Sequence, residues 1–121
     1  PVIGTLCGEA VSAASILFLS CDGCRVLPNS TMMIHSASFG YVSHQSNMVS
    51  QATFVDKQAR KILTEAYSDF LNSDELREVF HGKELWLDYD EINERLEKRD
   101  KIREQRFKEQ HPEMEFEDNE E

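Results

Sequence analysis

The sequence has little positive charge and no long hydrophobic run, and each shortage excludes a class of protein. Thirteen Lys and Arg stand against 23 Asp and Glu, a formal net charge of −10, so no basic patch is available to displace counterions from nucleic acid or an anionic membrane. The sequence starts at Pro1 with neither a methionine nor a positively charged leader, and it lacks the roughly 20 consecutive apolar residues that span a bilayer. We therefore expect a cytoplasmic protein without nucleic acid or membrane as a partner.

Cysteine is also scarce. The chain has three cysteines, an odd number that fits a reducing compartment better than a disulfide framework. Cys21 and Cys24 have the spacing of a metal or redox pair, but no second ligand pair accompanies them, and Gly23 between them is interpreted as the glycine that ends a helix. We predict neither a metal site nor a cofactor.

Charge is unevenly distributed along the chain. Residues 1–50 hold only Glu9, Asp22 and Arg25 as formal charges, whereas residues 91–121 hold twelve acids and seven bases. The apolar residues that can form a core lie in the first two-thirds of the sequence. The pattern predicts a catalytic domain over residues 1–90, a charged helical extension over residues 91–110 and an acidic disordered tail over residues 111–121.

Two short segments carry the candidate chemistry. The first, residues 8–15, is a turn of small residues that follows an apolar, strand-like run and opens a helix-compatible run over residues 12–19. Ser12 then lies at or near a helix N-terminus, where the free N–H of Ala13 can hold an oxyanion. Ser15, about one helical turn further on, is the alternative nucleophile, but its neighbours' amides are already bonded within the helix.

The second segment, residues 28–35, begins with a Pro-Asn-Ser turn and continues as a short β-favouring stretch that ends at His35. A serine at a small-residue turn and a histidine at the end of a strand together indicate a serine hydrolase, in which His35 takes the proton from Ser12. The pattern Gly-x-Ser-x-Gly is absent, which argues against an α/β-hydrolase.

At these residues the chain resembles the proteolytic subunits of the Clp (caseinolytic) proteases. The family's glycine, small-residue turn, nucleophilic serine and following small residues are matched by Gly8, Ala10, Ser12, Ala13 and Ala14. Its proline-asparagine-serine, apolar residues and catalytic histidine are matched by Pro28, Asn29, Ser30, Met33, Ile34 and His35. The resemblance runs from residue 1 to about residue 92.

The resemblance implies both a fold and an activity. The fold is α/β, the Clp-protease/crotonase-like superhelix of ββα units, of which this chain is the C-terminal part, with a long handle helix and a charged C-terminal helix. The activity is that of an ATP-dependent serine endopeptidase that cleaves unfolded polypeptides within a homo-oligomeric ring, one of two stacked rings, beside an AAA+ unfoldase. The N-terminal half that supplies another oxyanion donor in this family has no match here, so we expect low activity from the isolated chain.

The third catalytic position departs from the family pattern. The resemblance places Glu84 where the family has an aspartate, just before an aromatic-aliphatic pair. A glutamate can orient a histidine as an aspartate does, although its extra methylene requires a more distant backbone. Asp88 and Asp90 remain alternatives for this position.

The rest of the sequence is mainly helical in pattern. Apolar and alanine residues recur every seven positions over residues 48–71, which predicts one long helix that either covers the core or projects as the handle. Asn72 and Glu75 form a capping signal for a helix over residues 73–80, ended by Gly82. Residues 85–87 are expected to be a buried strand. The last helix is stabilised by acid-before-base pairs four residues apart and is expected to be mainly solvated.

Two other functions remain possible on the sequence alone. A non-catalytic scaffold of the same fold is favoured if Glu84 cannot reach His35. An acyl-CoA enzyme of the crotonase type shares the ββα repeats but gives no reason to pair Ser12 with His35.

Overall fold

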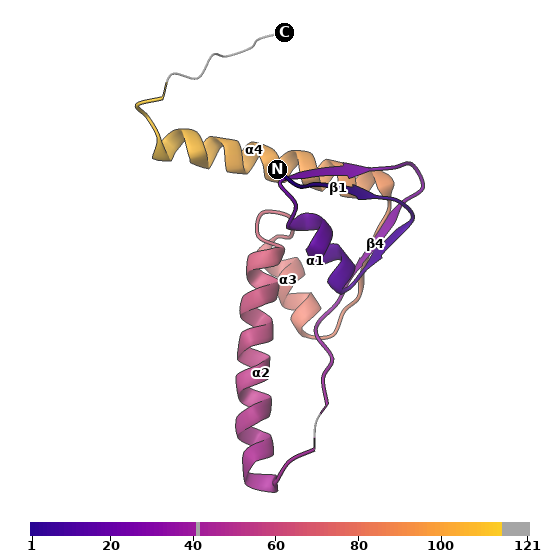
Figure 1. Cartoon of the computed structure of the whole chain (residues 1–121), viewed down its shortest axis with the longest axis vertical. Coiled ribbons are helices and arrows are strands. Elements are labelled where there is room, and N and C mark those ends of the chain that lie inside the picture. The colour runs from indigo at the N-terminus through magenta and orange to yellow at the C-terminus, as the bar shows by residue number, and fades with distance from the viewer. Residues whose placement is uncertain (41, 115–121) are drawn as a thin grey trace.

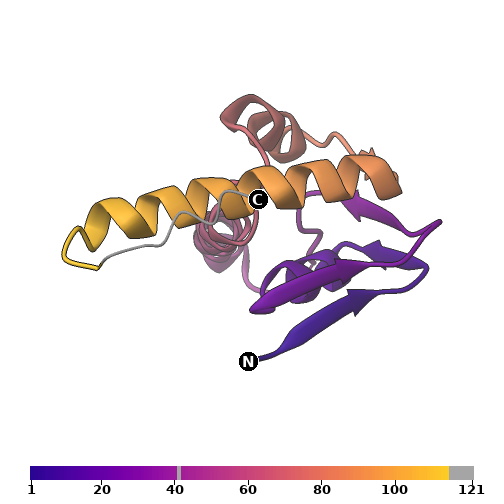
Figure 2. The ribbon, with the colours of Figure 1, turned by 90° about the horizontal axis from the view of Figure 1, so that it is seen from above.

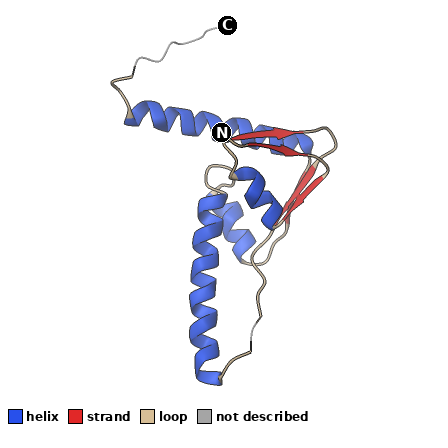
Figure 3. Ribbon diagram, in the orientation of Figure 1, coloured by secondary structure: helices blue, strands red, loops and turns tan. Residues whose placement is uncertain are grey.

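The computed structural model describes residues 1–40 and 42–114 (Figure 1). In this part of the chain, strands and helices follow one another in a mixed α/β arrangement (Figure 3). The elements are β1 (Ile3–Leu6), β2 (Glu9–Val11), α1 (Ala13–Leu19), β3 (Gly23–Val26), β4 (Thr31–Ile34), α2 (Gln45–Ala66), α3 (Ser73–Phe80), β5 (Leu85–Leu87) and α4 (Tyr89–Gln110). The predicted α/β class is confirmed at this level.

The strands form two small sheets beside α1. In the first sheet β1 pairs with β3 in parallel, with Ile3 opposite Gly23. In the second, β4 lies between β2, to which it is parallel, and β5, to which it is antiparallel. Parallel neighbours need a crossover, and α1 provides it for both pairs. The crossover from β2 to β4 therefore brings the carboxyl ends of these two strands to the same edge of the second sheet.

One hydrophobic core joins the strands to parts of every helix. It contains the inward-facing residues of the strands and of α1, together with the ends of α2 and α4 that lie against them. Its most completely buried large side chains are Tyr67, Met32, Ile34, Ile92 and Val79.

The predicted long helix is present as α2, but it ends at Ala66 rather than near residue 71. Figure 1 shows α2 extending away from the strands and from α4. Leu63 is its only fully buried residue, and Phe54 and Ile62 are 62% and 54% exposed. Most of α2 therefore does not cover the core of its own chain.

The predicted cap of α3 is confirmed, and α4 also begins with a side-chain cap. The Asn72 side chain accepts a hydrogen bond from the Glu75 N–H, and the Glu75 carboxylate accepts one from the Asn72 N–H, so that the capping box is complete. The Asp88 side chain caps α4 by accepting from the Glu91 N–H at 2.9 Å. Both caps satisfy N–H groups that have no partner within their helix.

Three local predictions were wrong. Residues 9–11 form β2, and residues 23–26 form β3, although neither short strand has a clear alternation in the sequence. Gly23 does not end α1, because α1 stops at Leu19 and Gly23 opens β3, where a Cβ atom would lie 2.7 Å from the Ile3 side chain. The strand β5 is only partly buried, since Trp86 is 55% exposed.

The last helix is docked rather than mainly solvated. Ile92 and Leu96 lie in the core and Arg99 is 3% exposed, so the first half of α4 packs on the body. Figure 2 shows α4 passing across the end of α2. The second half carries the predicted intrahelical pairs of Glu97 with Lys101 and of Glu104 with Lys108.

The acidic tail predicted for residues 111–121 lies outside the described residues from position 115 onward. Within the described ranges, none of the helices is both long enough and apolar enough to cross a membrane.

Candidate active site

The ends of β2 and β4 bring the two candidate catalytic side chains together. Val11 is the last residue of β2 and is paired with Met33 of β4, so that Ser12 and His35 both follow the carboxyl ends of neighbouring parallel strands. The Ser12 Oγ lies 2.7 Å from the His35 Nε2. Both residues are only partly buried. This is the distance and accessibility that a nucleophile and its general base require.

Ser12 has an uncommon backbone conformation. Its φ and ψ are 56° and −119°, in a region that L-residues rarely occupy and that costs on the order of 1–3 kcal/mol. Its N–H donates to the Met33 carbonyl at 2.9 Å, and its carbonyl accepts from the Ser15 N–H at 3.0 Å. The strained turn places the Ser12 side chain at the junction of β2 and α1, where it makes no capping bond and is directed to His35.

The two sequence motifs are connected by a buried serine. Ser30, 1% exposed, accepts a hydrogen bond from the Gly8 N–H at 3.2 Å and donates one to the Leu6 carbonyl at 3.1 Å. The turn that places Ser30 has Pro28 followed by Asn29 at φ 64°, and the Ser30 N–H donates to the Leu27 carbonyl, which is the pattern of a type II turn. The Pro-Asn-Ser turn thus fixes the start of β4 against the turn that leads to Ser12.

The Ala13 N–H is placed as an oxyanion donor would be. Ala13 is the first residue of α1 and is exposed. Its N–H has no acceptor among the described residues. A free amide beside the nucleophile can therefore donate to a negatively charged oxygen.

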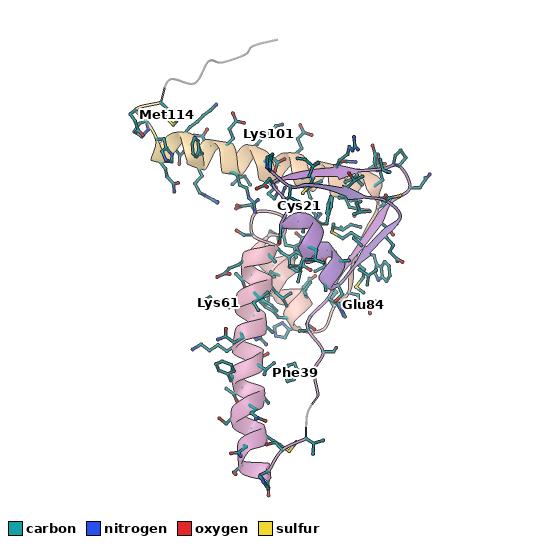
Figure 4. The ribbon with its side chains drawn as sticks, viewed as in Figure 1. Cys21, Phe39, Lys61, Glu84, Lys101 and Met114 are labelled. Atoms are coloured by element: carbon teal, nitrogen blue, oxygen red, sulfur yellow. The ribbon has the colours of Figure 1, made fainter. Side chains whose placement is uncertain are left out.

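Glu84 precedes β5, and its carboxylate has a partner other than His35. The register of β4 and β5 pairs Ile34 with Leu85, so its continuation sets Glu84 opposite His35. Figure 4 shows Glu84 at the start of β5, at the edge of the strands away from α4. Its Oε2 accepts a hydrogen bond from the Trp86 indole N–H at 3.1 Å.

Among the described residues, no hydrogen bond joins His35 to a carboxylate. The Asp88 carboxylate caps α4 by accepting from the Glu91 N–H with its Oδ1. The third catalytic position therefore stays a prediction, with Glu84 ahead of Asp88 and Asp90 because of the strand register.

A buried tyrosine at this site was not found from the sequence. The Tyr67 hydroxyl lies 2.7 Å from the Ser15 Oγ, which in turn donates to the Ser12 carbonyl at 2.6 Å. Burial raises the pKa of the Tyr67 hydroxyl, an effect that its hydrogen bond with Ser15 partly opposes. Tyr67 is 55 residues from Ser12 in the sequence, and no spacing rule connects them. Ser15, 0% exposed, is a supporting residue here and is not accessible as a nucleophile.

Cys21 and Cys24 form hydrogen bonds with nearby backbone carbonyls. The Cys21 thiol donates to the Leu17 carbonyl and the Cys24 thiol to the Phe18 carbonyl, each at the end of α1. Figure 4 places Cys21 at the end of α1 that lies next to α4. Across the described ranges, no three His, Cys, Asp or Glu side chains gather in a way that could hold a metal ion.

Comparison with known proteins identifies the family. The family model described as Clp protease matches residues 1–85, which is more than half of the chain and includes Ser12, His35 and Glu84. A search of curated proteins found no match. The chain therefore belongs to the Clp protease family, a family of serine peptidases.

Proposed function

We propose that this member of the Clp protease family is a serine endopeptidase in which Ser12 is the nucleophile and His35 the general base. The observation that carries the proposal is the 2.7 Å hydrogen bond between Ser12 Oγ and His35 Nε2. A serine that only capped a helix, or a histidine with only a structural role, would not require this hydrogen bond. A crotonase-type acyl-CoA enzyme also gives no role to such a pair.

The reaction begins with attack by the Ser12 Oγ on the carbonyl carbon of a peptide bond. His35 Nε2 accepts the hydroxyl proton during the attack and returns it to the leaving amine as the acyl-enzyme forms. Water then attacks the ester with His35 again acting as the base. The Ala13 N–H donates to the oxyanion in both tetrahedral intermediates, and one such donor typically contributes about 2.7–4 kcal/mol.

Glu84 completes the proposed triad as the carboxylate that orients His35. Its position opposite His35 in the extended register of β4 and β5 supports this role. The bond from Trp86 uses one carboxylate oxygen and leaves the other available for the His35 Nδ1–H. If Glu84 does not engage His35, the scaffold function becomes the better proposal.

The family's assembly is proposed for this chain as well. Clp proteases form rings that work with AAA+ unfoldases, and we propose that α2 is the handle by which this subunit contacts a second ring. The exposed apolar side chains of Val49, Phe54 and Ile62 support this proposal, since none of them is covered by the described residues. Polypeptides unfolded with ATP by the partner would be the substrates.

The experiment is hydrolysis of a fluorogenic unstructured peptide by the full chain and three variants. Ser12→Ala should abolish turnover. Glu84→Gln should lower kcat by about 100-fold or more without unfolding the protein, because the amide keeps the volume but does not stabilise the imidazolium. Asp90→Asn is the matched control and should retain activity. Turnover that persists in Ser12→Ala would overturn the proposal, and a loss confined to Asp90→Asn would move the third role to Asp90.

A further inference from the structure

We propose that Tyr67 and Ser15 are positioning residues that hold the Ser12 nucleophile in its strained conformation through a buried chain of hydrogen bonds. The inference rests on the proposed function of Ser12 and adds two residues to it. The chain runs from the Tyr67 hydroxyl to the Ser15 Oγ at 2.7 Å and from there to the Ser12 carbonyl at 2.6 Å.

The direction of each hydrogen bond follows from counting protons. The Ser12 carbonyl can only accept, so the single proton of the Ser15 hydroxyl must be donated to it. The Ser15 oxygen then has only lone pairs to offer, and the Tyr67 hydroxyl must be the donor of the other bond. Because burial raises the pKa of Tyr67, its hydroxyl keeps this proton at any pH at which a serine protease works.

Both hydroxyl groups of this hydrogen-bond chain are buried. Ser15 is 0% exposed and Tyr67 is 1% exposed, so water does not replace either hydroxyl if it is removed. The free-energy cost of leaving a buried polar group without its partner is of the same order as the strain of the Ser12 backbone. The hydrogen bonds are therefore strong enough to determine which conformation Ser12 adopts.

The same bonds determine where the Ser12 side chain points. Its φ is fixed on one side by the N–H bond to the Met33 carbonyl, and its ψ is fixed on the other by the direction of its own carbonyl. That carbonyl accepts from both the N–H and the hydroxyl of Ser15. With both dihedral angles held, the Cα–Cβ bond has one direction, and the Oγ meets His35 at 2.7 Å.

The hydrogen-bond chain begins at the C-terminal end of α2. Tyr67 is the C-cap of α2, and its N–H donates to the Leu63 carbonyl at 3.1 Å. The base of the projecting helix is thus in hydrogen-bond contact with the turn that holds the nucleophile. Removing only the Tyr67 hydroxyl leaves the ring in the core and tests the hydrogen bond rather than the packing.

The test compares the labelling rate of Ser12 by a fluorophosphonate probe in the full chain and in variants. Tyr67→Phe and Ser15→Ala should each slow labelling by about tenfold. The double variant should be no slower than the slower single variant, because the two residues act through the same chain of hydrogen bonds. Tyr89→Phe and Ser20→Ala are the matched controls. Tyr89 lies against the core, and the Ser20 hydroxyl donates to the Ile16 carbonyl within α1 and has no bond to Ser12 or Ser15. Both controls should label at the unmodified rate.

A second measurement separates failure of this inference from failure of the proposed function. The ring-nitrogen NMR resonance of His35 reports its hydrogen bond to Ser12 whether or not the chain is active. Tyr67→Phe should move this resonance in the direction that Ser12→Ala moves it, whereas Tyr89→Phe should not. If unmodified chain is not labelled at Ser12, the proposed function fails and the resonance decides the positioning role. An unmoved resonance or an unchanged labelling rate in folded Tyr67→Phe would overturn the inference.

Discussion

The helices α2 and α4 are both 22 residues long, but the one with more apolar residues is the less buried. Only Leu63 of α2 is fully buried, whereas α4 buries Ile92, Leu96 and Arg99. Helix α4 lies across the strands, whereas α2 extends away from them and has its one fully buried residue, Leu63, near its C-terminal end (Figures 1 and 2). Composition alone therefore does not decide which helix belongs to the core.

The polar contacts of α4 explain the difference. Arg95 forms two hydrogen bonds with the Glu75 carboxylate, at 2.6 and 2.9 Å, and another with the Phe70 carbonyl. Arg99 donates to the Leu19 carbonyl at the end of α1. The guanidinium groups of α4 therefore form hydrogen bonds with other elements where the helix docks. Because these charged groups have protein partners, the helix can bury its few apolar residues without leaving a buried charge unpaired.

The largest effect expected from this comparison is on core packing. Ile92→Ala should lower the free energy of unfolding by about 2–5 kcal/mol, because Ile92 is 0% exposed and its truncation leaves a cavity. Ile62→Ala on α2 is the matched control, and at 54% exposure it should change the free energy by no more than about 0.5 kcal/mol. Urea unfolding of the two variants measures both values. Equal losses would show that α2 is packed as tightly as α4.

A smaller effect is expected at the ion pair between α3 and α4. Glu75→Gln keeps an acceptor for the capping box but removes the charge that faces Arg95, and it should cost about 1–2 kcal/mol at pH 7. Thermal or urea unfolding at pH 7 provides the measurement. Glu78→Gln on the exposed face of the same helix is the control and should cost less.

The pH dependence of that difference follows from the pKa of Glu75. The hydrogen bonds from Arg95 hold this pKa below its ordinary value of 4.5, against the opposing effect of burial. A lowered folded-state pKa gives stability that is fully present above about pH 4.5 and is lost as the pH falls through the folded value. The gap between the unmodified chain and Glu75→Gln should therefore narrow as the pH falls below 4.5 and close once the pH is below the folded-state pKa. A gap that stays constant down to pH 2 would contradict the role of the charge.

The smallest effect is expected on the solvated half of α4. Lys101 and Glu97 are 74% and 70% exposed and form an intrahelical pair at 3.0 Å. Lys101→Ala should change the free energy of unfolding by about 0.5 kcal/mol or less, as exposed pairs of this kind do. Chemical unfolding at low and high salt checks this, and a loss above about 1 kcal/mol would indicate a tertiary role for this part of the helix.

The sequence predicted the features that depend on local chemistry. The capping box of α3, the long helix, the α/β class and the two motifs at Ser12 and His35 each come from residues close together in the chain, where propensity and spacing are informative. The strands β2 and β3 were missed because three or four residues that pair in parallel do not show an alternating pattern.

The remaining errors involve contacts between distant segments. Docking of α4 depends on Arg95 meeting Glu75 and on Arg99 reaching α1, neither of which has a signature in the sequence. The support of Ser12 by Tyr67 is of the same kind, since 55 residues separate the two. For the third catalytic position, the resemblance predicts Glu84 in place of the family's aspartate, and the bond from Trp86 is a detail that only the side-chain arrangement reveals.

The most direct test of the central claim, that Ser12 is a nucleophile activated by His35, is covalent labelling with a fluorophosphonate followed by mass spectrometry of the peptides. We expect a single adduct on Ser12 that is absent in Ser12→Ala and forms at least about 100-fold more slowly in His35→Ala. Ser20→Ala, an exposed serine on the same segment, should label as the unmodified chain does. An adduct on another serine, or labelling of Ser12 at the same rate without His35, would contradict the claim.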